Sequence, residues 1–260
     1  MQHTEIIEHF QARGRKTFTI EDIASLKVSR NAARLVIASL RSKGYIKSPA
    51  RGFYVILSPS ERRVGQVPPD TYIDQWMHFK NIDYYVGLLS AASFYGATHH
   101  RPMVYQVVTS AQITNSSEIG KQFQFHCKKH FPSNCLEKQK GRFGYITFSS
   151  PALTCYDVVK YGKHVGTLSN AYLVLSELSG QFKKSDFKNL LKNELEITVL
   201  QRLGFLLDNL GEQSIADVLH PRVAKANVYV PLSLIASAQG GKDEKWKLII
   251  NHDLENQDAA

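Results

Sequence analysis

Long apolar segments and pairable cysteines are both missing from this sequence of 260 residues. No apolar run approaches the roughly eighteen residues that a membrane-spanning helix needs, so we expect no contact with a membrane. The three cysteines, Cys127, Cys135 and Cys155, cannot all pair. An odd number of cysteines without an N-terminal apolar segment is typical of the reducing cytosol. We therefore expect a cytoplasmic protein without a disulfide framework.

Motifs of several common enzyme classes are missing as well. The sequence contains no phosphate-binding Walker loop, no Gly-x-Ser-x-Gly nucleophile motif and no glycine-rich dinucleotide-binding loop. The pair Asp186 and Lys188 has the acid-x-Lys spacing of restriction-type nucleases, but an Asp at a predicted helix start has the simpler role of favouring the helix dipole. No companion acid on a neighbouring strand is evident. We expect a protein that is not an enzyme and binds no cofactor.

Zinc-binding residue types occur together at His126, Cys127, His130 and Cys135. Their spacing fits no common zinc finger. His126 and Cys127 are also adjacent on a predicted strand, where successive side chains point to opposite faces. We therefore expect ordinary packing or surface roles for these residues and no bound metal.

Acidic residues are scarce in the first quarter of the chain. The whole sequence has 32 Lys and Arg against 23 Asp and Glu, a net charge of +9. Residues 1–66 contain twelve basic and five acidic side chains, a net of +7, which leaves only +2 for the other 194 residues. A basic module joined to a near-neutral one indicates a nucleic-acid-binding part and a second part with another role.

The segment 29–43 carries the clearest pattern in this basic module. Ala33, Val36, Ile37 and Leu40 recur every three or four residues and predict one apolar face of a helix. Ser29 is a suitable N-cap, and Gly44 is placed to end the helix. No acidic residue occurs between positions 29 and 47. This composition is typical of a helix that approaches phosphates.

The neighbouring segments predict a winged helix-turn-helix over residues 1–57. Residues 4–12 form a first helix, and Thr19 caps a short second helix with Asp22 three residues later, close to a capping box. A three-residue turn leads into the basic helix, and two strand-like runs at 45–47 and 52–57 follow it. In this motif the second helix of the pair lies in the DNA major groove. The alternative is a small helical subdomain with a solvated basic face.

The predicted DNA contacts divide into base contacts and phosphate contacts. Arg30, Asn31 and Arg34 lie at the leading end of the basic helix, where Arg can pair with guanine and Asn with adenine. Ser29 is expected to cap the helix and to touch phosphate, and Arg41 lies further toward the DNA backbone. The other phosphate contacts are expected from Arg13, Lys16, Lys27, Lys47 and the wing residue Arg51. Because one winged helix reads few base pairs, we expect pairs of copies on inverted half-sites.

The rest of the chain predicts a larger α+β domain. Pro59, Pro68 and Pro69 disfavour regular structure, so we place a linker at 58–75, an α+β domain at 76–250 and a disordered tail at 251–260. Within the domain we expect a helix at 82–95, strands at 103–109, 123–127 and 144–148, and mainly helices after residue 151.

Two segments of this domain resemble a known family. Residues 84–109 (YYVGLLSAASFYGATHHRPMVYQVVT) are similar to the signature segment of AbiEi antitoxins, and residues 149–159 (SSPALTCYDVV) resemble another part of that family. The predicted winged helix agrees, and the resemblance extends over about residues 4 to 235. AbiEi proteins are the regulatory halves of type IV toxin–antitoxin systems, which act in abortive infection of phage-attacked bacteria.

The resemblance implies an antitoxin that is also a transcriptional autorepressor. Its winged helix would bind inverted repeats in the promoter of its own operon, and its C-terminal domain would counteract a nucleotidyltransferase-like toxin, without requiring a stable complex. The residues alone also permit a ligand-responsive regulator whose α+β domain senses a small molecule. A DNA-cutting enzyme is a more remote alternative.

Overall fold

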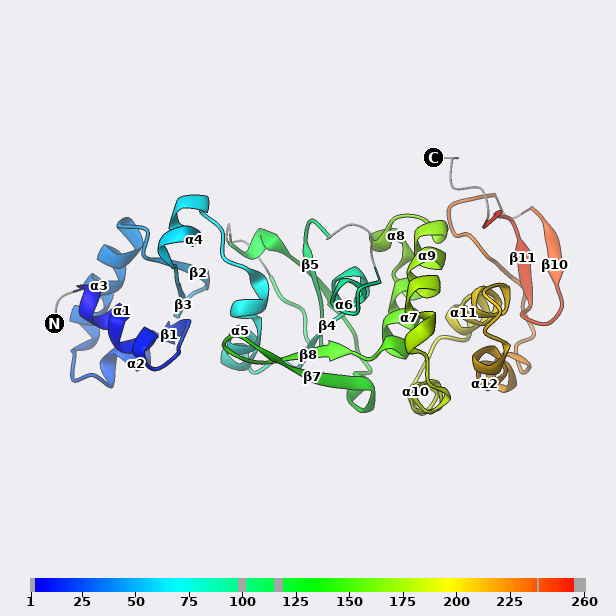
Figure 1. Ribbon diagram of the computed structural model, residues 1–260, viewed down its shortest axis with the longest axis horizontal. Coiled ribbons are helices and arrows are strands. Elements are labelled where there is room, and N and C mark those ends of the chain that lie inside the picture. Colours follow the sequence, from blue (N-terminus) through cyan, green and yellow to red (C-terminus); the bar gives the residue numbers. More distant parts are fainter. Residues whose placement is uncertain (1–2, 98–101, 115–118, 238, 255–260) are drawn as a thin grey trace. The chain divides into compact units, whose positions relative to one another are not determined.

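The computed structural model describes residues 3–97, 102–114, 119–237 and 239–254 (Figure 1). The chain divides into two compact units. Unit 1 comprises residues 1–85, 103–129 and 138–147, and unit 2 comprises residues 86–102, 130–137 and 148–260. The ranges 1–57, 58–75 and 76–250 were placed from the proline content and the expected elements of the sequence, and they stay a prediction.

Unit 1 begins with a helical module and a small antiparallel sheet. Its elements are α1 (His3–Ala12), β1 (Thr17–Thr19), α2 (Ile20–Ala24), α3 (Arg30–Ser42), β2 (Ile46–Ala50) and β3 (Phe53–Ile56). The strands lie in the order β1-β3-β2 with antiparallel pairing. Helix, helix, hairpin is the order that a winged helix-turn-helix requires, and the predicted limits of the basic helix agree with α3.

The core of this module explains why its helices form where they do. Ile6 and Phe10 of α1, Ile23 of α2 and Ile37 of α3 are all buried in one cluster. The Phe10 and Phe18 rings stack in it with centroids 5.1 Å apart. The expected capping box of α2 is present: Thr19 accepts from the Asp22 backbone N–H, and the Asp22 carboxylate accepts from the Thr19 N–H at 2.7 Å.

The expectation of irregular chain over residues 58–75 is wrong for much of that range. Residues Pro59–Val64 form α4, because Pro59 occupies the first turn, where a helix tolerates proline, and Ser58 and Glu61 form a capping box. A 3-10 helix at Pro69–Thr71 and α5 (Ile73–Lys80) follow. Proline at a helix start favours the helix, whereas the expectation from the sequence treated proline only as a helix breaker.

A five-stranded mixed sheet follows, in the order β6-β5-β4-β8-β7. Its strands are β4 (Tyr84–Val86), β5 (Tyr105–Thr109), β6 (Phe123–Cys127), β7 (Leu136–Gly141) and β8 (Gly144–Ser149), with short 3-10 helices at Ile119–Gln122 and Ser133–Cys135. The pairs β5–β6 and β4–β8 are parallel. In unit 1, Trp76 of α5 packs on β6, its ring 5.4 Å from that of Phe123. The three predicted strands are confirmed.

The predicted single helix at 82–95 is wrong. Residues 84–86 form the buried strand β4, and only Leu88–Phe94 form a helix, α6. Two tyrosines and a valine favour a strand, and Gly87 then serves as N-cap of α6. Leu88 enters the helix with a φ of 50°, a backbone conformation that helical periodicity does not anticipate.

The remaining elements of unit 2 are mostly helices, as expected. They are α7 (Pro151–Lys160), α8 (Gly162–Val165), α9 (Leu168–Leu178), a 3-10 helix at Ser179–Gln181, α10 (Lys184–Leu190), α11 (Ile197–Asn209) and α12 (Gln213–Val223). A small sheet in the order β10-β11-β9 follows, from β9 (Val230–Pro231), β10 (Gly241–Asp243) and β11 (Leu248–Ile250). The α+β fold class with a larger C-terminal part is confirmed.

The end of the chain was expected to be disordered from residue 251. Asn251 is instead tied to the chain: its amide nitrogen donates to the Ser233 carbonyl at 3.0 Å, and its oxygen accepts from the Ser233 N–H at 2.8 Å. Residues 255–260 lie outside the described residues.

Candidate nucleic-acid interface

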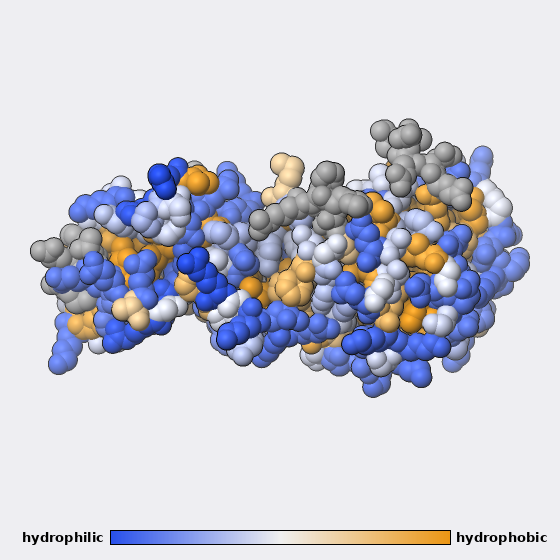
Figure 2. Space-filling view, viewed as in Figure 1, coloured by the Kyte–Doolittle hydropathy of each residue, from blue (hydrophilic) through white to orange (hydrophobic). Residues whose placement is uncertain are grey.

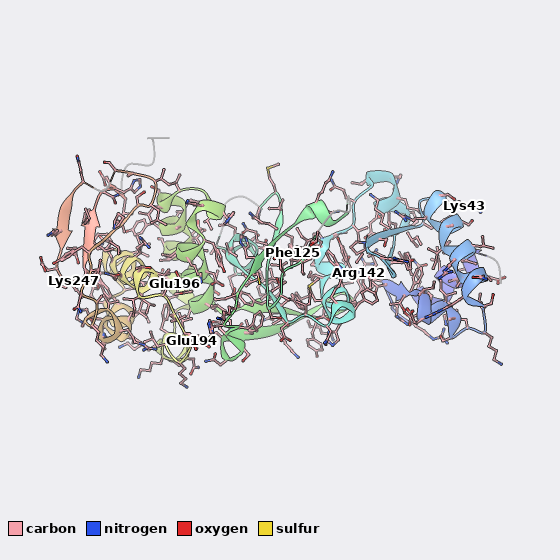
Figure 3. All side chains as sticks on the ribbon, turned by 180° about the vertical axis from the view of Figure 1, so that it is seen from behind. Lys43, Phe125, Arg142, Glu194, Glu196 and Lys247 are labelled. Carbon is pink, nitrogen blue, oxygen red and sulfur yellow. The ribbon has the colours of Figure 1, made fainter. Side chains whose placement is uncertain are left out.

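Helix α3 presents one apolar and one polar face, as its sequence predicts. Ala33, Ile37 and Leu40 are buried against the rest of the module. The Ser29 hydroxyl caps the first turn by accepting from the Ala32 N–H at 3.3 Å, and Lys43, labelled in Figure 3, closes the helix. The helix contains no acidic residue. Its outward face is therefore electropositive and can bind an anionic surface.

Three predicted contact residues of α3 are exposed and uncommitted. Asn31, Arg34 and Arg41 make no hydrogen bond or ion pair through their side chains within the part of the chain that the structure describes. Exposed side chains that have no partner within the protein can contact phosphates and base edges. The geometry thus leaves these side chains available.

Arg30 is partly committed to the protein itself. Its Nη2 lies 3.4 Å from a Glu21 carboxylate oxygen of α2, and the two side chains are 69% and 61% exposed. An exposed pair of this kind contributes only about 0–1 kcal/mol, so DNA could displace it. Arg30 therefore remains a candidate, with part of its charge neutralised.

The wing residue Arg51 is exposed between β2 and β3, and its charge acts on Tyr54 together with that of Arg41. Burial raises the pKa of Tyr54, and the charges of Arg41 and Arg51 act in the opposite direction. Both cations therefore act on the same half-buried ring. The Glu21 carboxylate of α2 acts on the same ring and raises its pKa, so charges of both signs act on Tyr54.

Lys16 and Lys47 are poorly placed for the phosphate contacts expected of them. Lys16 is only 8% exposed and its ammonium forms an ion pair with Glu61. Lys47 is half-buried and donates to the Gly65 carbonyl. Both lysines tie α4 to the small sheet, where Arg62 also lies over the Tyr45 ring at 4.3 Å. The sequence showed that both residues are cations, but it did not show that residues 59–64 form a helix whose ends bind them.

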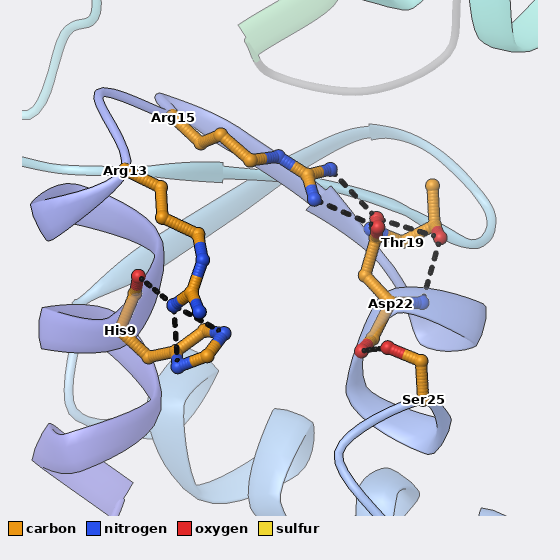
Figure 4. Close-up of polar contacts among 6 residues, drawn as sticks. All are labelled: His9, Arg13, Arg15, Thr19, Asp22 and Ser25. Carbon is orange, nitrogen blue, oxygen red and sulfur yellow. Dashed lines mark hydrogen bonds and ion pairs between the residues drawn. The ribbon is translucent and has the colours of Figure 1, made fainter.

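The remaining predicted cations flank the module at its loops. Arg13 is exposed, and its Nη1 lies 2.7 and 2.8 Å from the two ring nitrogens of His9 (Figure 4). Lys27 is exposed in the turn before α3, with a φ of 62°. Arg15, which was not predicted to bind DNA, pairs with both carboxylate oxygens of Asp22 at 2.8 and 2.9 Å. Only Arg13 and Lys27 of these three stay available to phosphates.

Leu35 is the residue that the sequence analysis missed. Its side chain is 73% exposed on α3. The signal was present in its spacing, since Leu35 lies four residues after Asn31 and off the apolar face. Figure 2 shows that the visible surface is mostly hydrophilic, with apolar residues exposed in several places.

The described residues give no support to the nuclease alternative or to the zinc-site alternative. Within the ranges that the structure describes, no three His, Cys, Asp or Glu side chains gather in a way that could hold a metal ion. His126 is buried while Cys127 is exposed, in keeping with opposite faces of β6. Asp186 lies in the first turn of α10 and accepts from the Ser185 hydroxyl at 3.0 Å.

Two family models match the chain and together extend over both of its functional parts. The model described as "AbiEi antitoxin C-terminal domain" matches residues 85–209, and the model described as "Transcriptional regulator, AbiEi antitoxin" matches residues 5–56. The chain belongs to the AbiEi antitoxin family. This AbiEi antitoxin therefore joins a regulator part, which contains α1 to β3, to an antitoxin part.

A solved structure has the same fold. The crystal structure of the RV2827C protein from Mycobacterium tuberculosis superposes with a TM-score of 0.70 at 14% sequence identity, over 95% of this chain and 90% of that chain. At this identity the likeness concerns the fold alone. No protein with a curated description matches this AbiEi antitoxin. In the described ranges no helix has the length and apolar character needed to cross a membrane.

Proposed function

We propose that this AbiEi antitoxin represses its own operon by binding inverted repeats in the promoter through a winged helix-turn-helix. The observation that carries this proposal is the exposed, acid-free face of α3 with Asn31, Arg34 and Arg41, extended by Arg51 of the wing. It lies within residues 5–56, which match a transcriptional regulator. Arg34 and Asn31 would read bases, and Arg13, Lys27, Arg41 and Arg51 would contact phosphates.

Specific binding would need two copies of the chain. One α3 can contact only a few base pairs, whereas paired half-sites about one helical turn apart multiply both affinity and specificity. A mobility-shift titration of the full chain on its promoter fragment tests this proposal. Two complexes, retained against excess scrambled DNA, are expected. Equal affinity for promoter and scrambled DNA would contradict it.

The antitoxin part would counteract a nucleotidyltransferase-like toxin. The match of residues 85–209 to the AbiEi antitoxin C-terminal domain supports this assignment. Co-expression with the neighbouring gene, scored as recovery of growth, tests it. A full chain with Arg34→Ala and Arg41→Ala, expressed from a foreign promoter, should rescue growth as well as the wild type. Loss of rescue by this variant, while it stays folded, would show that neutralisation depends on DNA binding.

A ligand-sensing regulator is the second candidate. Two hollows in the described part of unit 2 could admit a small molecule. One, of about 470 Å³, lies beside Phe205 and His252, and the other, of about 440 Å³, lies between α10 and α12. Both are open to solvent, unlike the enclosed apolar pockets that bind most small ligands. Repression that is relieved by a metabolite extract, with no effect on the toxin, would favour this candidate.

A further inference from the structure

The outward stripe of α3 has an apolar residue at its centre. At about 100° per residue, Asn31, Leu35, Ala38 and Ser42 fall within a sector of about 60°, opposite the buried Ala33 and Leu40. Leu35 is 73% exposed, and it is not among the hydrophobic residues that pack on the core of the module. The arginines of α3 lie along one side of this stripe, and Arg34 is the nearest of them.

The position of Leu35 limits what it could contact on DNA. If α3 lies in the major groove as proposed above, its central stripe and the adjoining Arg34 face the base edges, and the residues further from the stripe face the phosphate walls. Base edges in the major groove offer hydrogen-bonding groups and one apolar group, the 5-methyl group of thymine. A leucine side chain can neither donate nor accept a hydrogen bond, so the methyl group is its only favourable partner there.

The neighbouring residue points to the same base pairs. Asn31 lies one turn before Leu35, and an Asn side chain pairs with the N6 and N7 atoms of adenine. One turn of helix rises about 5.4 Å, and one base pair rises about 3.4 Å. The two side chains would therefore contact bases one or two pairs apart, and both contacts require A·T pairs.

We propose that Leu35 reads the 5-methyl group of a thymine, so that each operator half-site has an A·T pair facing Asn31 and a thymine facing Leu35. This inference rests on the proposed function, because it assumes that α3 enters the major groove. It adds the class of sequence that is recognised. A scattered surface leucine is otherwise unremarkable, and contact with a second copy of the chain is the competing use of such a residue.

The first step of the test identifies the preferred DNA. Full-length wild-type protein and Leu35→Ala are each used to select binding sites from a random double-stranded library. The wild type should select A·T pairs at two positions of the half-site that lie one or two base pairs apart. Leu35→Ala should keep the position read by Asn31 and lose the preference for thymine at the other.

The second step removes the methyl group alone. In the selected site, each thymine is replaced in turn by deoxyuridine, which keeps base pairing and hydrogen bonding. Wild-type affinity should fall about fourfold at one position, the effect of exposing one buried methyl group. Leu35→Ala should bind the site with thymine and the site with deoxyuridine equally. Leu35→Met, which keeps an apolar side chain, should retain the sensitivity.

Control variants separate this inference from the proposal on which it rests. Val64, which is 72% exposed on α4 and outside α3, gives a matched apolar control, and Val64→Ala should respond to deoxyuridine as the wild type does. If no single thymine matters, or if Leu35→Ala stays sensitive, the inference is overturned while specific DNA binding stands. If Leu35→Ala changes only the sedimentation of the free protein, Leu35 joins two copies and the inference is likewise overturned. Absence of specific DNA binding in the wild type would overturn both.

Discussion

Replacement of Glu61 by Gln should destabilise unit 1 strongly. The Glu61 carboxylate pairs with the Lys16 ammonium, and their side chains are only 14% and 8% exposed. Glu61→Gln keeps the size of the side chain and an oxygen for the Ser58 N–H, which donates to Glu61 at 2.7 Å. What it removes is the charge that compensates Lys16.

The magnitude follows from the burial of the pair. Loss of one partner of a buried ion pair costs about 3–5 kcal/mol, and the residual exposure of Glu61 places the expected loss near the lower figure. This is a large share of the roughly 5–15 kcal/mol that stabilises a typical domain. Urea unfolding followed by the fluorescence of Trp76, which is buried in unit 1, measures it in a Trp246→Phe background, because Trp246 of unit 2 also emits. Lys16→Met with Glu61→Gln should recover most of the loss, because no buried charge is then unpaired.

The dependence of this loss on pH gives an independent check. Burial acts to raise the pKa of Glu61, but its bonds with Lys16 and Ser58 outweigh burial and hold it below the ordinary value of 4.5. A depressed pKa stabilises the fold above the unfolded-state value, and that contribution is lost as the pH falls through the folded-state pKa. The difference between wild type and Glu61→Gln should be full at pH 7 and shrink below about pH 4.5. An unchanged urea midpoint at pH 7 would refute this reasoning.

Four further predictions concern DNA and stability. Arg34→Ala should cost about 1–3 kcal/mol on the operator and relax one base position, whereas Arg51→Ala should weaken all sequences alike in mobility shifts. With four phosphate contacts per copy, log K against log salt should have a slope of about −3 to −4, and a flat response would contradict the interface. Lys27→Gly should stabilise the protein by less than about 1 kcal/mol in urea unfolding, since glycine tolerates its φ of 62°. Gly204→Ala should lower the midpoint of unit 2, because a Cβ there overlaps the Trp246 ring.

Helix periodicity and capping made the regulator part predictable from the sequence. The apolar spacing of α3 and the pair Thr19 and Asp22 act within a few residues, so their consequences are local and readable. The strands β5, β6 and β8 were equally readable from their β-branched and aromatic content.

Long-range contacts made the rest unpredictable. The commitment of Lys16 depends on Glu61, forty-five residues away, and nothing near Lys16 in the sequence signals that pair. The strand at 84–86 has the same apolar character as the helix after it, so periodicity alone merged the two. The outward position of Leu35 follows from its spacing, because it falls off the predicted apolar face, but no role was assigned to it from the sequence.

The central claim is that the exposed face of α3 binds the promoter. Its most direct test is fluorescence anisotropy of labelled promoter DNA with the full chain, comparing Arg34→Ala/Arg41→Ala with Lys183→Ala/Lys184→Ala. Both double variants remove two exposed cations, but Lys183 and Lys184 lie in unit 2, at the start of α10. The account predicts that the arginine variant loses specific binding, with a Kd at least tenfold higher, while the lysine variant binds as the wild type does. Equal affinity of the two variants would contradict it.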